Sequence, residues 1–246
     1  MADVVILFAL HRERMPFWRS FADRQRLAVP GLAWDCGRVQ IVHGGYGPKR
    51  MSETLDWLLP RRPGVIVLAG FSGGLAPDLR VGDLVTASEI VTDDGIVPVS
   101  FSLPGVRAGR IYAASEIRSL TAEKMSDYAR TGSLAVDLES ASVARRCQAS
   151  GISFGCLRAI SDEAQQTLPQ ELPQITRGES IRPWRLLLAL IRRPGLLLDL
   201  IGLARATSLA ARSLATGLTA WLRSSMPMEP TPPALLKQHL PSRFDR

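Results

Sequence analysis

Three acidic residues each come at or just after the end of an apolar run that predicts a buried strand. The runs and their acids are residues 4–10 with Glu13, residues 134–138 with Glu139, and residues 154–160 with Asp162. Because the carboxyl ends of parallel strands share one edge of a sheet, the three carboxylates can converge there. A single acid at such a position more often balances the dipole of the following helix. All three beside a glycine-rich turn indicate an active site that uses carboxyl groups.

The glycine-rich turn is expected directly after a short apolar strand. Residues 65–69 are all apolar and mostly β-branched, which predicts a strand buried on both faces. Gly70, Gly73 and Gly74 follow, and glycine lets a backbone turn tightly or approach a ligand. A purely structural turn is the other interpretation. The chain has neither the Gly-Lys-Ser/Thr pattern of a phosphate cradle nor the spaced glycines of a dinucleotide site.

The other apolar runs alternate between strand and helix patterns. Strands are expected at residues 32–35, 39–43, 83–91, 96–101 and 110–113, and helices at 49–58, 121–130 and 142–150. This alternation predicts a three-layer α/β fold around a mixed, mostly parallel central sheet, with a C-terminal helical extension. We expect a catalytic domain at 1–180, a basic amphipathic helical extension at 181–225 and a proline-rich tail at 226–246.

Composition limits the classes of partner and compartment. The 246 residues carry a formal net charge of +7, which favours an anionic partner or surface. Residues 181–222 hold six arginines and one acid but no platform of aromatic residues for base stacking, so nucleic acid is not an expected partner. Cys36, Cys147 and Cys156 lack metal-ligand spacing, so no metal is expected and the thiols are predicted to be reduced in a cytoplasmic protein. The N-terminus predicts a first strand rather than a signal peptide, and no apolar run reaches the roughly 18 residues of a transmembrane helix.

A second glycine-rich segment, residues 44–48, precedes the helix expected at 49–58. Three glycines before a helix N-terminus can form an anion site, and Lys49 and Arg50 add positive charge beside it. A plain turn between a strand and a helix fits the same residues equally well.

Four segments, in this order, resemble the nucleoside phosphorylase/nucleosidase superfamily. They are Ala-Leu-His-Arg-Glu at 9–13, Gly-Phe-Ser-Gly-Gly-Leu at 70–75 with Val-Gly-Asp at 81–83, Ala-Val-Asp-Leu-Glu-Ser-Ala-Ser-Val-Ala at 135–144, and Leu-Arg-Ala-Ile-Ser-Asp at 157–162. The resemblance is strongest to the methylthioadenosine/S-adenosylhomocysteine nucleosidases. It implies N-glycosidic cleavage of a purine nucleoside, no cofactor, and a homo-oligomer.

The resemblance implies a role for each matching polar residue. Glu13 takes the place of the acid that positions and activates the attacking water, and Glu139 matches the acid that hydrogen-bonds the ribose hydroxyls. Asp162, supported by Ser161, matches the acid that protonates the leaving purine. These roles fit the chemistry, because breaking the bond leaves positive charge on the sugar and negative charge on the base.

The resemblance also implies which residues line the substrate site. Gly73 and its neighbour Ser72 match the sugar and nucleophile side. Leu138 replaces a methionine that packs against ribose, and Ile117 falls near the position of an aromatic residue that stacks on the base.

Two departures from the family pattern leave the nucleophile open between water and inorganic phosphate. Phosphorylases usually carry an arginine where this chain has Leu68 and a serine where it has Phe71. A phosphate co-substrate would therefore need other cations, for which the candidates are Arg12, Arg14, Lys49 and Arg50.

A narrower resemblance comes from Gly-Tyr-Gly-Pro at 45–48 and from residues 192–197 and 203–205. These segments look like the hopanoid-associated phosphorylases, which act as adenosylhopane nucleosidases and release adenine. The resemblance implies a lipid-linked adenine nucleoside as substrate. Methylthioadenosine, S-adenosylhomocysteine or a futalosine-like nucleoside are alternatives, and a non-catalytic nucleoside-binding module is a further one.

Residues 181–222 predict helices at 184–191 and 196–222, separated by a break at Pro194 and Gly195. Apolar residues with recurring arginines are typical of helices that lie on an anionic membrane surface, with Trp221 dipping into it. This pattern predicts peripheral contact with the inner face of the cytoplasmic membrane and an apolar opening to the 5′ side of the sugar pocket. The other interpretation is a helical lid packed on the core or on a second subunit.

Overall fold

Three neighbouring parallel strands form the centre of the fold: β1 (Val4–Phe8), β5 (Val65–Gly74) and β10 (Ser153–Asp162). β5 lies between the other two and pairs in parallel with both. Most of their side chains are buried, as expected for apolar runs covered on both faces. The computed structural model describes residues 3–29, 31–45, 47–169, 176–177, 180–181 and 193–225.

Seven further strands of the described chain extend or close this sheet. β4 (Val39–His43), β3 (Leu32–Cys36) and β2 (Gln25–Arg26) continue it beyond β1. β9 (Ala135–Asp137), β8 (Arg107–Ala113) and β6 (Leu84–Thr92) lead from β5 back to β10, and β7 (Gly95–Pro98) pairs with β6. Because β10 also pairs with β5, these strands close into a ring. A separate pair is formed by β11 (Thr176–Arg177) and β12 (Ser180–Ile181).

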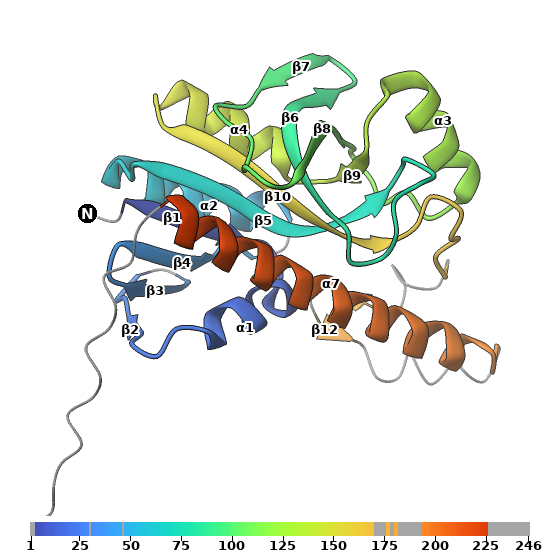
Figure 1. Ribbon diagram of the computed structural model, residues 1–246, viewed down its shortest axis with the longest axis horizontal. Coiled ribbons are helices and arrows are strands. Elements are labelled where there is room, and N and C mark those ends of the chain that lie inside the picture. Colours follow the sequence, from blue (N-terminus) through green and yellow to red (C-terminus); the bar gives the residue numbers. More distant parts are fainter. Residues whose placement is uncertain are drawn as a thin grey trace, which may run out of the picture.

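Helices cover both faces of the sheet. α2 (Pro48–Leu58) and α4 (Ser140–Ala149) pack on one face, and α1 (His11–Arg19) and α7 (Leu196–Ser225) pack on the other, each pair with its own apolar core. α7 crosses the sheet in Figure 1, and α3 (Thr121–Thr131) follows β8. A short 3-10 helix, Leu59–Arg61, follows α2. The expected three-layer α/β fold with a mixed sheet and a C-terminal helix is confirmed.

The glycine-rich stretch after residue 69 is not the turn expected from the sequence but the second half of β5. Its residues pair with β10 and β9. A Cβ on Gly70 would lie 2.5 Å from Arg158 Nη1, and a Cβ on Gly73 would lie 3.1 Å from Asp162 Oδ2. The glycines therefore leave room for polar side chains of the neighbouring strand rather than turning the backbone.

α7 is one helix with two different halves. In its second half, Leu214 is fully buried and Trp221 stacks on Phe101 with ring centroids 6.1 Å apart. The expectation that Trp221 contacts a membrane is therefore wrong, because the protein core covers this side chain. In the first half, which projects beyond the sheet in Figure 1, Leu197 and Leu198 are 51% and 73% exposed.

The helix expected at 184–191 and the tail at 226–246 lie outside the described residues. Within the described part of the chain, no helix combines the length and the apolar character needed to cross a bilayer.

The packing of α7 can be tested by shortening one buried leucine. Leu214→Ala should lower the free energy of unfolding by about 2–5 kcal/mol, because the side chain is fully buried against the sheet. Leu198→Ala, on the exposed half, should change it by less than about 0.5 kcal/mol. Urea denaturation measures both values. Equal effects of the two substitutions would show that α7 is not docked as described.

Candidate active site

A cavity of about 300 Å³ opens where β5, β9 and β10 end. Eight residues singled out in the sequence line it: Glu13, Ser72, Gly73, Ile117, Leu138, Glu139, Ser161 and Asp162. They come from five separate parts of the chain, and the fold brings them together. The volume lies at the lower end of the range found for small-molecule pockets.

Glu13 reaches the cavity from the first turn of α1 and is 2% exposed. Its carboxyl group accepts two backbone hydrogen bonds of 2.8 Å, from Leu10 N–H to Oε2 and from Phe71 N–H to Oε1. Burial raises the pKa of Glu13 to about 7, although the Phe71 N–H and the positive charge of Arg158 oppose the rise. A carboxyl group with this pKa can take up a proton near neutral pH.

Glu139 occupies the N-cap position of α4, and Leu138 separates it from the end of β9. Burial raises the pKa of its carboxyl group, and the charge of Arg158 acts in the opposite direction. The charge of Arg158 thus acts on both Glu139 and Glu13, which come from different elements of the fold.

Asp162 is the last residue of β10, and both of its carboxylate oxygens are held. Oδ1 accepts a hydrogen bond of 2.7 Å from Ser161 Oγ, and Oδ2 lies 2.5 Å from Lys124 Nζ. The Asp162 side chain therefore has a fixed orientation on the cavity wall beside Gly73.

The structure adds a cation that the sequence reasoning missed. Arg158 in β10 is 1% exposed, and its Nη2 lies 2.5 Å from Asp137 Oδ2. Burial alone would lower the pKa of this guanidinium, but the charges of Asp137, Glu139 and Glu13 keep it above its ordinary value. The signal for Arg158 was present in the sequence, because a single charged residue interrupts the apolar run at 154–160.

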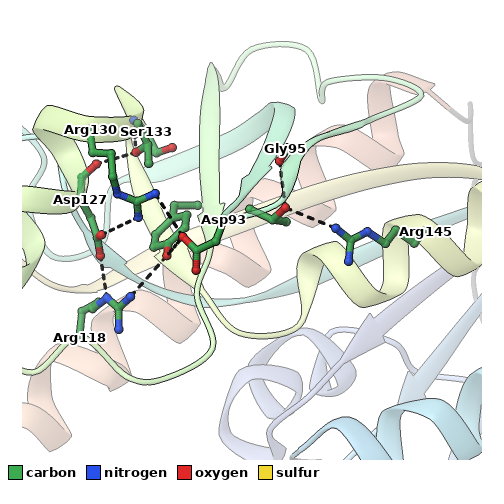
Figure 2. Close-up of polar contacts among 10 residues, drawn as sticks. Asp93, Gly95, Arg118, Asp127, Arg130, Ser133 and Arg145 are labelled. Atoms are coloured by element: carbon green, nitrogen blue, oxygen red, sulfur yellow. Dashed lines mark hydrogen bonds and ion pairs between the residues drawn. The ribbon is translucent and has the colours of Figure 1, made fainter.

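A polar network holds the segment that forms the rim of the cavity. Arg118, next to Ile117, donates from Nε to Asp127 Oδ2 over 2.6 Å. Asp127 Oδ1 in turn accepts 2.9 Å from Arg130, which also contacts Asp93 over 3.1 Å (Figure 2). These contacts join the segment after β8 to α3 and fix the rim at which Ile117 lies.

The proposed phosphate-binding cations lie elsewhere. Arg12, Lys49 and Arg50 are exposed and do not line the cavity, and Arg14 stacks on Trp34 with 4.2 Å between the guanidinium carbon and the ring centroid. Across the described residues, no three His, Cys, Asp or Glu side chains are grouped to hold a metal ion.

Comparison with known proteins agrees with this geometry. Residues 31–105 and 102–192 match the model of the phosphorylase superfamily. The chain belongs to this superfamily. As a member, it is an enzyme that cleaves N-glycosidic bonds.

Two bacterial relatives of this superfamily member are 5′-methylthioadenosine/S-adenosylhomocysteine nucleosidases. The protein of Anoxybacillus flavithermus is 27% identical over 201 positions, which cover 66% of this chain and 86% of the relative. The protein of Geobacillus thermodenitrificans is 26% identical over 196 positions, which cover 65% and 83%.

Solved structures share the fold of this superfamily member. The 5′-methylthioadenosine/S-adenosylhomocysteine nucleosidase of Helicobacter pylori superposes with a TM-score of 0.70 at 17% identity, over 91% of this chain and 98% of that one. The futalosine hydrolase of the same organism superposes with a TM-score of 0.69 at 18% identity, with the same coverage.

Burial of Glu13 should make stability depend on pH. Its pKa of about 7 in the folded protein exceeds the ordinary 4.5, so the folded state binds more protons than the unfolded state between these values. The free energy of unfolding therefore falls as pH rises from about 4.5 to about 7. Glu13→Gln should reduce this fall, whereas Glu53→Gln, at an exposed position, should leave it unchanged. Urea denaturation across this range measures the slope, and an undiminished slope in Glu13→Gln would contradict the assignment.

Proposed function

We propose that this superfamily member hydrolyses the bond between adenine and ribose in a 5′-substituted adenosine. The named activities of the two bacterial relatives favour 5′-methylthioadenosine and S-adenosylhomocysteine as substrates. The main support from the structure is that Glu13, Glu139 and Asp162, which are far apart in the sequence, line one cavity.

In the proposed mechanism, Asp162 donates a proton to the adenine ring as the glycosidic bond breaks. The proton neutralises the negative charge that develops on the leaving base. The contacts of Ser161 and Lys124 support a fixed position for this acid, because each holds one carboxyl oxygen of Asp162 on the cavity wall.

Glu139 and Glu13 act on the ribose and on the attacking water. Glu139 binds the ribose hydroxyls and stabilises the positive charge that develops on the ribose ring. Glu13 orients the attacking water and takes its proton, a role that its pKa of about 7 suits. Ser72, Gly73 and Leu138 line the space for the ribose, and Ile117 lies at the rim.

Water is the nucleophile that the cavity favours. Arg12, Lys49 and Arg50 are exposed and outside it, and Arg158 is already in contact with Asp137. An assay of 5′-methylthioadenosine with and without inorganic phosphate tests this choice by chromatography of both products. We expect free adenine and unphosphorylated 5-methylthioribose at equal rates in both conditions. A phosphorylated sugar would identify phosphorolysis, and no adenine release from any adenine nucleoside would favour a non-catalytic binding module.

The role of Asp162 predicts a large loss of turnover in Asp162→Asn, by roughly 10²–10⁴-fold, because an amide cannot supply the proton. Asp78→Asn, at an exposed position that pairs with Arg107, is the matched control and should keep full activity. Steady-state adenine release measures both variants, with circular dichroism as the check on folding. Near-normal turnover in Asp162→Asn would remove Asp162 from the proposed mechanism.

A second cavity favours a second candidate substrate, adenosylhopane. This cavity has a volume of about 480 Å³ and shares Leu168 and Leu203 with the first one. The first turns of α7 form one wall, to which Leu198 contributes. A large apolar group on the 5′ carbon of the nucleoside would extend along the leucines of this cavity, while the rest of the lining includes the polar residues Gln166, Thr167, Arg193 and Asp199.

Adenosylhopane as a substrate would also require contact with a membrane surface. The exposed leucines of α7 would enter the lipid surface while Arg205 meets anionic headgroups. The homo-oligomer implied by the family resemblance stays a prediction.

The second candidate can be tested at Leu198. Leu198→Asp should lower cleavage of adenosylhopane in anionic vesicles by about 10-fold or more, because a charge in place of this exposed leucine opposes both lipid contact and contact with an apolar 5′ group. Cleavage of 5′-methylthioadenosine should stay unchanged. Deleting residues 181–246 is not a suitable test, because it removes Leu214 from the core. Equal rates of wild type and Leu198→Asp on adenosylhopane would rule out this use of the second cavity.

A further inference from the structure

Lys124 is a cation to which the proposed mechanism gives no chemical role. It comes from the first turn of α3, and its side chain is 0% exposed. A buried ammonium group is tolerated only where its charge and its hydrogen-bond donors are satisfied. The partners of Lys124 therefore indicate what the charge is for.

All three donors of the Lys124 ammonium group have acceptors. Nζ lies 2.5 Å from Asp162 Oδ2, and it donates to the carbonyl oxygens of Glu163 and Gln166 over 2.9 and 3.0 Å. The two carbonyl oxygens orient the head group, and the third proton points at the carboxylate of Asp162. The other oxygen of Asp162 accepts from the neutral hydroxyl of Ser161. Lys124 is therefore the charged contact of this side chain.

We propose that Lys124 is a positioning residue that acts through Asp162 to let the purine base leave. The inference rests on the proposed function. As the glycosidic bond breaks, its electron pair moves into the adenine ring. Asp162 enters the reaction after it has taken up a proton from solvent, and its O–H bond breaks while an N–H bond forms on the ring. The carboxylate that remains on Asp162 faces the ammonium of Lys124, which stabilises the new negative charge inside a buried site.

A purely structural role would not require a charge at this position. The segment after β10 is already joined to the start of α3 by neutral contacts. Leu168 N–H donates to the Ser119 carbonyl oxygen over 2.8 Å, and Thr121 Oγ donates to the Gln165 carbonyl oxygen over 3.2 Å. The ammonium group of Lys124 adds a positive charge next to the carboxyl group of Asp162, which these neutral contacts do not supply.

The test compares two leaving groups in the same enzyme. Lys124→Met keeps the unbranched side chain as far as Cε and removes the charged ammonium group. We expect the kcat for adenine release from 5′-methylthioadenosine to fall about 10²-fold, with KM changed by less than about threefold. Cleavage of a 4-nitrophenyl riboside, whose leaving group needs no proton, should stay within about threefold of wild type. In an Asp162→Asn background, Lys124→Met should cause no further loss, since Lys124 acts only through Asp162.

Two further variants separate this role from folding. Lys124→Gln keeps amide donors for the two carbonyl oxygens and should show the same selective loss, so the test stands even where Lys124→Met does not fold. Thr131→Val is the matched control, because it removes buried hydrogen bonds from the same helix without contact to Asp162. It should retain activity on both substrates.

The outcomes that overturn the inference are distinct from a failure of the proposed function. Unchanged adenine release in both Lys124 variants, or an equal loss on the two leaving groups, would exclude the role of Lys124. Absence of adenine release from the wild-type enzyme would instead reject the proposed function before any variant is compared.

Discussion

A buried arginine is the constraint on which the cavity depends. Arg158 lies in β10 opposite Gly70 of β5, and its charge acts on Asp137, Glu139 and Glu13. An isolated charge at 1% exposure would be very costly, and three carboxylates without a cation would be equally so. Burial of the arginine and of the carboxylates together lowers the desolvation cost of each. The missing Cβ of Gly70 leaves space that the side chains of Arg158 and Glu13 occupy.

The carboxyl groups of the cavity do not share the positive charges equally, and two chemically different regions result. Asp137 takes the direct contact with Arg158, so Glu13 is left with the pKa of about 7 that burial imposes. Asp162 lies apart from this group and has its own cation, Lys124. In the proposed mechanism, the charges around Arg158 act on the sugar and the nucleophile, and the pair of Asp162 and Lys124 acts on the base.

Most of the cavity lining could be predicted from the sequence. The expected reason holds for Glu13 and Asp162, which follow or end the parallel strands β1 and β10, but β9, which precedes Glu139, runs antiparallel to β5. The sequence did not indicate Lys124, since a lysine on an amphipathic helix usually faces solvent. The glycines of β5 predict a turn because a sequence shows their conformational freedom, but it does not show the space that Arg158 and Asp162 take beside them. The apolar pattern of α7 predicted a helix with an apolar face, but it could not show that the core covers Trp221 while Leu198 stays exposed.

The claim that one cavity surrounds a sugar–base bond is tested most directly by a crystal structure of Asp162→Asn with bound 5′-methylthioadenosine. We expect the ribose hydroxyls on Glu139, the purine ring beside position 162, and a water molecule between Glu13 and the anomeric carbon. A nucleoside bound outside the cavity, or a cavity without nucleoside at saturating concentration, would contradict the claim.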